Sequence, residues 1–342
     1  MRVKLEDVCE RGSSNLKQSD VEDNTGNYPI YGAAGCLGNV NFYHQDKPYV
    51  AVVKDGAGIG RTTLHPAKSS VIGTMQYLIP KENILPEYLY YVVKHMHLEK
   101  YFTGATIPHI YYKDYKKEEL NLVDLKLQAE VVRILKKVEG MIVVRKQELE
   151  KLDTLIKSRF VEMFGDPIGN SMGLRTIPLG AACYLKAGIT TSADAIHEYS
   201  TDYSIPCYGG NGIRGYVKEA TQCGCYPIIG RQGALCGNIQ LAMGEFHATE
   251  HAVLVTPLIE INVVWLFHLL KLMDLYRFHT GAAQPGLAVK TLNTVDIPIA
   301  DIVEQDRFAT FVRSIDKLKA TIQKSIDEAQ TLFDSLMQEY FG

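Results

Sequence analysis

Two long stretches of the chain carry apolar side chains at alternating steps of three and four residues. In the first stretch they are Val131, Ile134, Val138, Met141 or Ile142, Leu149, Leu152, Leu155 or Ile156, and Phe160. In the second they are Phe308, Phe311, Ile315, Leu318, Ile322, Ile326, Ala329, Phe333, Leu336 and Tyr340. This heptad spacing predicts two helices, over 125–165 and 302–342, each about 55 Å long at 1.5 Å per residue. Arg145 is a local departure from the apolar stripe.

Outside these stretches the hydrophobic pattern is that of mixed globular domains, over 1–124 and 166–301. Short apolar runs beside glycine-rich turns predict buried strands at 49–53 and 253–255. Longer apolar segments predict helices over 86–101, which starts with a proline, and over 262–278. Apolar residues at 120–122 and 297–299 close each globular part, so we expect an α+β fold in both.

From Tyr28 to the end of its first copy the chain repeats itself at a fixed offset of 177 residues, and upstream Leu5 and Cys9 match Leu179 and Cys183 at an offset of 174. The matched segments include YPIYGAAG (28–35) with IPCYGGNG (205–212), Thr103-Gly104-Ala105 with Thr280-Gly281-Ala282, and Phe164-Gly165 with Phe341-Gly342. Many matched positions are glycine or proline, which fix the backbone conformation. The two copies are therefore expected to share a fold and to differ in surface chemistry.

The duplication also predicts how the two long helices pair. A lone helix with such a stripe would expose it, whereas two of them can bury each other. Because each helix starts at its own globular domain, we expect an antiparallel coiled coil with the domains at opposite ends, related by a pseudo-twofold axis. The alternative is a coiled coil that serves only as a dimerisation spacer.

The composition indicates the cellular compartment and excludes several classes of protein. The chain has 342 residues, 46% hydrophobic and 22% charged, with a net charge of −3, which is ordinary globular usage. Residues 1–10 are charged and lack the apolar core of a secretory signal, and the seven cysteines cannot all pair. Ile261–Met273 is too short to span a membrane and is predicted as a buried helix. We therefore expect a cytoplasmic protein with reduced thiols.

The paired endings of the two globular parts resemble those of the specificity subunits of type I restriction-modification systems. In the first copy they are Thr103 to Ile110, Leu120-Asn121-Leu122 and Gln128, and in the second Thr280 to Leu287, Ile297-Pro298-Ile299 and Gln305. The resemblance covers essentially the whole chain. It implies two α/β target-recognition domains, 1–124 and 166–301, joined by two long helices of a central antiparallel coiled coil.

The resemblance also implies a function without catalysis in this chain. Each domain would read one half of a split target in double-stranded DNA, and the coiled coil would fix the gap between the halves. Two methyltransferase subunits and the restriction-translocase subunits would dock on the chain. S-adenosylmethionine and ATP would then bind those partners, and this chain would hold no cofactor. One departure from the family is the short length of the recognition domains.

Side chains able to contact DNA gather in two loops of each domain. Arginine and lysine pair with guanine or phosphate, and glutamine and asparagine pair with adenine. The candidates in the first domain are Tyr31, Lys54, Arg61, Thr103, Thr106, His109 and Lys113. Those in the second are Asn211, Arg214, Arg231, Gln232, Asn238, Thr280, Gln284 and Lys290. The alternative is that the shared glycines and Thr-Gly-Ala segments only shape turns.

The charge balance constrains this DNA-binding hypothesis. The net charge is −1 over 1–124 and −3 over 166–301, so any DNA-binding surface must be a local patch. The methyltransferase subunits are expected to supply much of the phosphate binding. The main alternative function is a pseudo-dimeric scaffold that binds protein partners and no DNA.

Nucleotide binding, metal binding and catalysis find less support in the sequence. The loop DGAGIG (55–60) lacks the Gly-Lys-Ser/Thr ending of a Walker loop and the context of a dinucleotide loop. The residues that could suggest zinc are Cys207, Cys223, Cys225, Cys236, His247 and His251. They lack paired CxxC spacing, so we favour structural thiols and predict no metal. No methyltransferase motif, nuclease cluster or catalytic triad is recognised.

Overall fold

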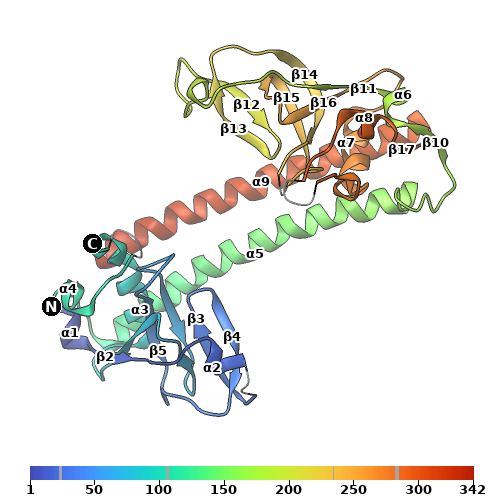
Figure 1. Ribbon diagram of the computed structural model, residues 1–342. Coiled ribbons are helices and arrows are strands. Elements are labelled where there is room, and N and C mark those ends of the chain that lie inside the picture. Colours follow the sequence, from blue (N-terminus) through green and yellow to red (C-terminus); the bar gives the residue numbers. More distant parts are fainter. Residues whose placement is uncertain (23–24, 105–107, 234, 282–284) are drawn as a thin grey trace. The chain divides into compact units, whose positions relative to one another are not determined.

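The computed structural model describes residues 1–22, 25–104, 108–233, 235–281 and 285–342, which form two compact units (Figure 1). Unit 1 comprises Met1–Lys146 and Lys324–Gly342, and unit 2 comprises Gln147–Gln323. The division runs through both long helices, α5 (Leu125–Phe164) and α9 (Ile302–Phe341). Each helix is continuous over 40 residues, which confirms the prediction from the heptad spacing.

The globular part of unit 1 combines a sheet in the order β2-β8-β5-β6, a sheet in the order β4-β3-β7 and a β1-β9 ribbon. The strands are β1 (Arg2–Lys4), β2 (Cys9–Ser13), β3 (Tyr28–Gly32), β4 (Gly35–Val40), β5 (Tyr49–Val53), β6 (Thr62–His65), β7 (Ser70–Val71), β8 (Met75–Pro80) and β9 (Glu119–Asn121). The helices are α1 (Leu5–Val8), α2 (Ser19–Glu22), α3 (Pro86–His95), the 3-10 turn η1 (Leu98–Tyr101) and α4 (Tyr112–Tyr115). Strand β5 is buried along its whole length, as its run of apolar residues predicts.

The globular part of unit 2 has a sheet in the order β11-β16-β14-β15-β12-β13 and a β10-β17 ribbon. The strands are β10 (Arg175–Pro178), β11 (Cys183–Ala187), β12 (Ile205–Gly209), β13 (Gly212–Val217), β14 (Gln222–Gly230), β15 (Ile239–Ala248), β16 (Ala252–Pro257) and β17 (Asp296–Ile299). The helices are α6 (Leu179–Ala182), the 3-10 turn η2 (Ala193–Ala195), α7 (Val263–Leu272), the 3-10 turn η3 (Leu275–Phe278) and α8 (Val289–Asn293).

The strand pairing confirms the duplication residue by residue. In unit 1, β3 pairs in parallel with β7, with Ile30 opposite Ser70. In unit 2, β12 pairs in parallel with β15, with Cys207 opposite His247, which is the same pairing at the offset of 177. Strand β15 is continuous in unit 2, whereas its counterpart in unit 1 is split into β6 and β7. The split follows from Pro66, which ends β6 because proline cannot donate to the strand ladder.

The helices that follow the sheets are shorter than the predicted 86–101 and 262–278. α3 ends at His95 and α7 at Leu272, and a 3-10 turn follows each of them. His97 and Asp274, which precede these turns, have left-handed backbones with φ of 50° and 47°. The apolar pattern continues across the break because the 3-10 turns are also packed into the core, and such a pattern cannot distinguish one helix from two.

Unit 2 confirms that α5 and α9 run antiparallel, because Phe160 near the end of α5 meets Phe308 near the start of α9 at 5.3 Å between ring centroids. In unit 1 the end of α9 packs on α3, where the Phe341 ring meets Tyr88 edge-on at 5.2 Å between centroids. In unit 2 the end of α5 packs on α7, where the Phe164 ring meets Trp265 edge-on at 5.8 Å. These two contacts are equivalent at the offset of 177. Each globular part is thus closed by the end of the helix that belongs to the other copy.

One member of the predicted stripe is wrong, because Leu318 is 47% exposed. Where two neighbours were predicted as alternatives, Ile142 and Ile156 are the buried ones, and Met141 and Leu155 are 48% and 45% exposed. The heptad spacing alone cannot decide between neighbouring apolar residues, because helix packing selects the one that faces the partner.

The structure also bears on the expected thiols and on the apolar segment near residue 261. All seven cysteines are free, and Cys207 and Cys236 are buried, as expected for apolar packing positions. Helix α7 is the buried helix predicted over Ile261–Met273. Among the described helices, none combines the length and the apolarity that a membrane span needs.

Phe308 offers a test of the core of unit 2, because its side chain is fully buried against Phe160 and Phe164. Phe308→Ala should lower the free energy of unfolding by about 3–5 kcal/mol, because it removes a buried ring and leaves a cavity. Urea unfolding followed by the fluorescence of Trp265, the single tryptophan, measures this loss. The control is Phe102→Ala at a position that is 58% exposed, and an equal loss in both variants would contradict the packing described here.

Candidate nucleic-acid interface

In unit 1 the two predicted loops lie side by side. The Gly56 N–H donates to the carbonyl of Pro108 (3.0 Å), and the Ile110 N–H donates to that of Lys54 (2.9 Å). Thr103 and His109 exchange two backbone hydrogen bonds of 2.8 Å. The loop that follows β5 is thereby fixed to the segment that precedes α4, and Lys54, Thr103 and His109 come together.

A charged cluster occupies this crossing in unit 1. His109 Nδ1 lies 2.7 Å from Asp55 Oδ1, and Lys54 Nζ lies 3.7 Å from Asp55 Oδ2. Asp55 is not among the candidates derived from the sequence, yet it orients two of them. Arg61 is exposed and its guanidinium lies over Gly58, where a Cβ would collide with it. Domain 1 thus presents the Asp55 carboxylate between the Lys54 ammonium and the His109 ring.

Unit 2 repeats the backbone of this crossing with other side chains. The Gly233 N–H donates to the carbonyl of Pro285 (3.0 Å), and the Leu287 N–H donates to that of Arg231 (2.8 Å). These are the bonds of unit 1 at the offset of 177. Gln232 and Gly286 stand opposite each other where unit 1 has Asp55 and His109. The Asp55–His109 pair of domain 1 is therefore replaced by Gln232 and Gly286 in domain 2, and Arg231 stands at the position of Lys54.

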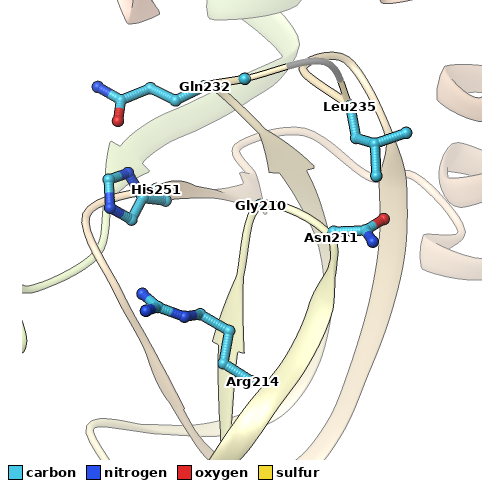
Figure 2. Close-up of a pocket in the computed structure, with 7 residues that line it drawn as sticks. Gly210, Asn211, Arg214, Gln232, Leu235 and His251 are labelled. Atoms are coloured by element: carbon cyan, nitrogen blue, oxygen red, sulfur yellow. The ribbon is translucent and has the colours of Figure 1, made fainter. Parts of the chain in front are cut away.

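A hollow of about 500 Å³ lies beside the crossing in domain 2, and we call it the domain 2 hollow. Its lining residues are Gly210, Asn211, Arg214, Gln232, Gly233, Leu235 and His251. Figure 2 shows that the side chains of Arg214, Gln232 and His251 extend toward one side of the hollow. Three of the predicted residues, Asn211 and Arg214 from the β12–β13 hairpin and Gln232 from the loop after β14, thus share one concave surface that offers both hydrogen-bond donors and acceptors.

Close backbone packing shapes the wall of the hollow. A Cβ on Gly230 would collide with the carbonyl oxygen of Gly210, so the two chain segments can approach this closely only with glycine at position 230. The Asn238 side chain donates to Asn211 Oδ1 (2.9 Å) and so holds that amide at the rim.

A polar network lies behind His251. His251 Nε2 is 3.2 Å from Glu250 Oε1, and Glu250 Oε2 accepts from the Thr191 N–H (3.2 Å). The Thr191 hydroxyl also lies 2.8 Å from His247 Nε2. Although desolvation raises the pKa of Glu250, backbone N–H groups and the charges of His251 and Arg214 shift that pKa downward overall. The hollow therefore has a fixed negative charge behind its cationic lining.

The other predicted residues are placed less centrally. Tyr31 on β3 is half-buried against His65, with 4.3 Å between ring centroids. Lys113 and Lys290 lie on the short helices α4 and α8, after the crossings, and are exposed. Thr280 exchanges backbone hydrogen bonds with Gly286, and its side chain is exposed. Thr106 and Gln284 lie outside the described residues.

His251 also lines the hollow, whereas the sequence suggested it only as a possible zinc ligand and not as a DNA contact. The offset of 177 places it opposite Thr74, and the two positions accept equivalent backbone bonds of 3.0 Å, from Arg231 and from Lys54. That alignment could have identified it, because Lys54 and Arg231 were already paired. Within the ranges that the structure describes, no group of three or more His, Cys, Asp or Glu side chains is arranged to hold a metal.

Comparison with known proteins follows the same division into two copies. A family model described as the type I restriction modification DNA specificity domain matches residues 1–154 and 180–330. The specificity subunit of the type I restriction enzyme EcoprrI of Escherichia coli is 38% identical over 203 residues, which are 58% of this chain and 50% of that protein. A putative type I restriction enzyme specificity subunit of Haemophilus influenzae, S.HindORF215P, is 31% identical over 120 residues, 34% of this chain and 30% of that protein. The matches thus span half or less of these relatives' own lengths.

Solved structures share the fold over the whole chain. The S subunit of a type I restriction-modification system from M. genitalium has a TM-score of 0.64 at 16% identity, covering 100% of this chain and 96% of that one. A chain from a structural study of complex assembly and conformational transition of the type I R-M system has a TM-score of 0.58 at 14% identity, covering 99% and 97%. At these identities the likeness establishes the fold.

His65, which supports Tyr31, makes the stability of unit 1 depend on pH. Burial lowers the pKa of His65 to about 4, whereas the unfolded imidazole titrates near 6.5. The neutral ring therefore stabilises the fold fully above about pH 6.5, and this contribution is lost as the pH falls toward 4, by up to about 1.4 kcal/mol per pH unit. Chemical unfolding followed by circular dichroism between about pH 7 and pH 5 measures this slope.

His65→Phe should reduce that slope, because the phenylalanine ring does not titrate. His97→Phe is the matched control, since the side chain of His97 is 71% exposed. The assignment fails if both variants retain the slope of the parent chain.

Proposed function

The chain belongs to the family of type I restriction-modification DNA specificity domains, and on this premise we propose that it recognises a split sequence in double-stranded DNA for a type I restriction-modification complex. The observation that carries the proposal is the pair of loop crossings, which have the same backbone hydrogen bonds and different side chains. Two domains that bind different DNA half-sites need the same backbone geometry with different polar side chains.

The chemistry of the two crossings supports different base preferences. In domain 2, Arg214 supplies a guanidinium that can pair with guanine, and Gln232 supplies an amide that can pair with adenine in the major groove. In domain 1, Asp55 supplies an acceptor that can pair with the amino group of cytosine, and Lys54 and Arg61 supply donors. The exposed Lys113 and Lys290 are suited to phosphate contacts, which position the protein without specifying sequence.

Partner subunits complete the proposed function. Because both recognition domains carry a negative net charge, we assign much of the phosphate binding to two methyltransferase subunits docked on the pseudo-equivalent halves. The restriction-translocase subunits join the same assembly, which works in the cytoplasm. S-adenosylmethionine and ATP bind those partners, and this chain acts without turnover of its own.

The proposed mechanism is geometric. Each domain contributes part of the binding free energy, and the helices make the second contact intramolecular once the first has formed. Only a DNA target whose half-sites have the matching separation allows both contacts together.

The first test is selection from randomised duplex DNA by the chain co-expressed with its cognate methyltransferase subunit. We expect one asymmetric sequence with two conserved parts and a gap of fixed length, and sequencing of methylated DNA should return the same sequence. Recovery of no conserved sequence, with the methyltransferase still bound, would favour the scaffold that binds proteins alone.

Individual side chains of the domain 2 hollow provide a second test. Arg214→Ala or Gln232→Ala should cost about 1–3 kcal/mol of discrimination at one base pair in the half-site read by domain 2. Binding measured against salt concentration should keep its slope, because neither change removes a phosphate contact. Lys290→Ala is the control and should weaken all sequences alike. Unchanged preference in both hollow variants would refute this assignment.

The length of the helices provides a third test. Inserting one heptad into each of α5 and α9 lengthens each helix by about 10 Å, which corresponds to about three base pairs at 3.4 Å each. The preferred gap should lengthen accordingly, as mapped by the methylated sequence. An unchanged gap would argue against the idea that the length of the helices sets the separation of the half-sites.

A further inference from the structure

The fourth residue of each long helix is a buried glutamine. Gln128 in α5 is 0% exposed and Gln305 in α9 is 1% exposed. A buried amide costs free energy unless both its oxygen and its NH2 group find partners. Both glutamines find theirs where the globular domain joins its helix.

Gln128 ties three segments of unit 1 together. Its Oε1 accepts from the backbone N–H of Leu85 (2.8 Å), the residue before α3. Its Nε2 donates to the carbonyl of Asn83 (3.0 Å) in the turn before α3, and to that of Val123 (2.9 Å) in the linker before α5. The amide therefore joins the start of α5 to the start of the domain helix that packs beside it.

Gln305 makes the equivalent joint in unit 2. Its Oε1 accepts from the backbone N–H of Asn262 (2.9 Å), and its Nε2 donates to the carbonyl of Ala300 (2.8 Å). Asn262 and Ala300 are the counterparts of Leu85 and Val123 at the offset of 177. Asn262 also caps α7 and donates from its side chain to Asp306 of α9 (2.7 Å).

An apolar residue of the same size would fill these sites but would leave the backbone N–H of Leu85 or Asn262 without its partner. The hydrogen bonds add direction, because the donors and acceptors of one planar amide point to different segments at fixed angles. A fixed direction matters on DNA, where one extra base pair moves the second half-site by about 3.4 Å and rotates it by about 35° around the duplex axis.

We propose that Gln128 and Gln305 are positioning residues that lock each recognition domain to its helix and thereby set how strictly the gap between half-sites is read. This inference rests on the proposed function. A loosened joint would let a domain follow a half-site that is displaced and rotated. The difference in affinity between targets with the correct gap and targets with a wrong gap would then become smaller.

The test compares Gln128→Met, Gln305→Met and the double variant with the parent chain, each in complex with the methyltransferase subunit. Methionine keeps the volume and removes the hydrogen bonds. The probes are the duplex selected by the parent complex and two duplexes with the gap one base pair longer or shorter. The ratio of the dissociation constants for wrong and correct gaps should fall at least about tenfold in the double variant. Gln147→Met, at an exposed position of α5, should keep the parent ratio.

Two further measurements separate positioning from stability. A duplex with a single half-site should bind the variants as it binds the parent, since the joint does not contact DNA. Gln128→Glu keeps the acceptor for Leu85 but sets a buried carboxylate oxygen against the carbonyls of Asn83 and Val123, so it should relax the gap ratio at least as much as Gln128→Met. A lowered melting temperature with an unchanged gap ratio in every folded variant would overturn the proposal. Failure of the parent complex to select any split sequence would instead refute the proposed function.

Discussion

The structure depends on the burial of two apolar helix stripes that neither helix can cover alone. The end of α5 packs on Trp265 in unit 2, and the end of α9 packs on Tyr88 in unit 1, so each copy completes the core of the other. An amphipathic helix of 40 residues gains most of its stability from such packing. Because each helix is continuous and shared by two cores, the duplication produces one interdependent molecule and not two independent domains joined by a linker.

The two loop crossings have the same backbone geometry in both units, whereas their side chains differ. The glycines at the loop crossings and the exchanged backbone bonds occur in both units, whereas Asp55 and His109 give way to Gln232 and Gly286. Backbone hydrogen bonds fix the loops without using side chains, so the side chains can change without loss of the crossing. Conserved geometry with variable chemistry at the rim is the physical basis for a pair of readers with unlike targets.

The sequence predicted the elements that depend on local periodicity and on the repeat. The long helices, the buried strand β5 and the equivalence of the two copies follow from apolar spacing and from glycine and proline positions. The ends of α3 and α7 were mispredicted because an apolar 3-10 turn continues the pattern past His97 and Asp274. His251 was missed as a DNA contact because its place in the domain 2 hollow arises from the meeting of distant segments, as does the contact of His109 with Asp55. Periodicity carries no information on such pairs.

The negative net charge of both recognition domains fits the proposed function better than a basic surface would. A strongly basic domain would bind any duplex through phosphates, and a single half-site would then hold the protein without the second. With net charges of −1 and −3, one domain alone gains little from the backbone, so base contacts contribute a larger share of its affinity. Two weak contacts joined at a fixed distance then discriminate more sharply than one strong contact, because a wrong base or a wrong gap removes the intramolecular advantage of the second site. Under the proposed function, weak binding by each domain would therefore sharpen the reading of a split sequence.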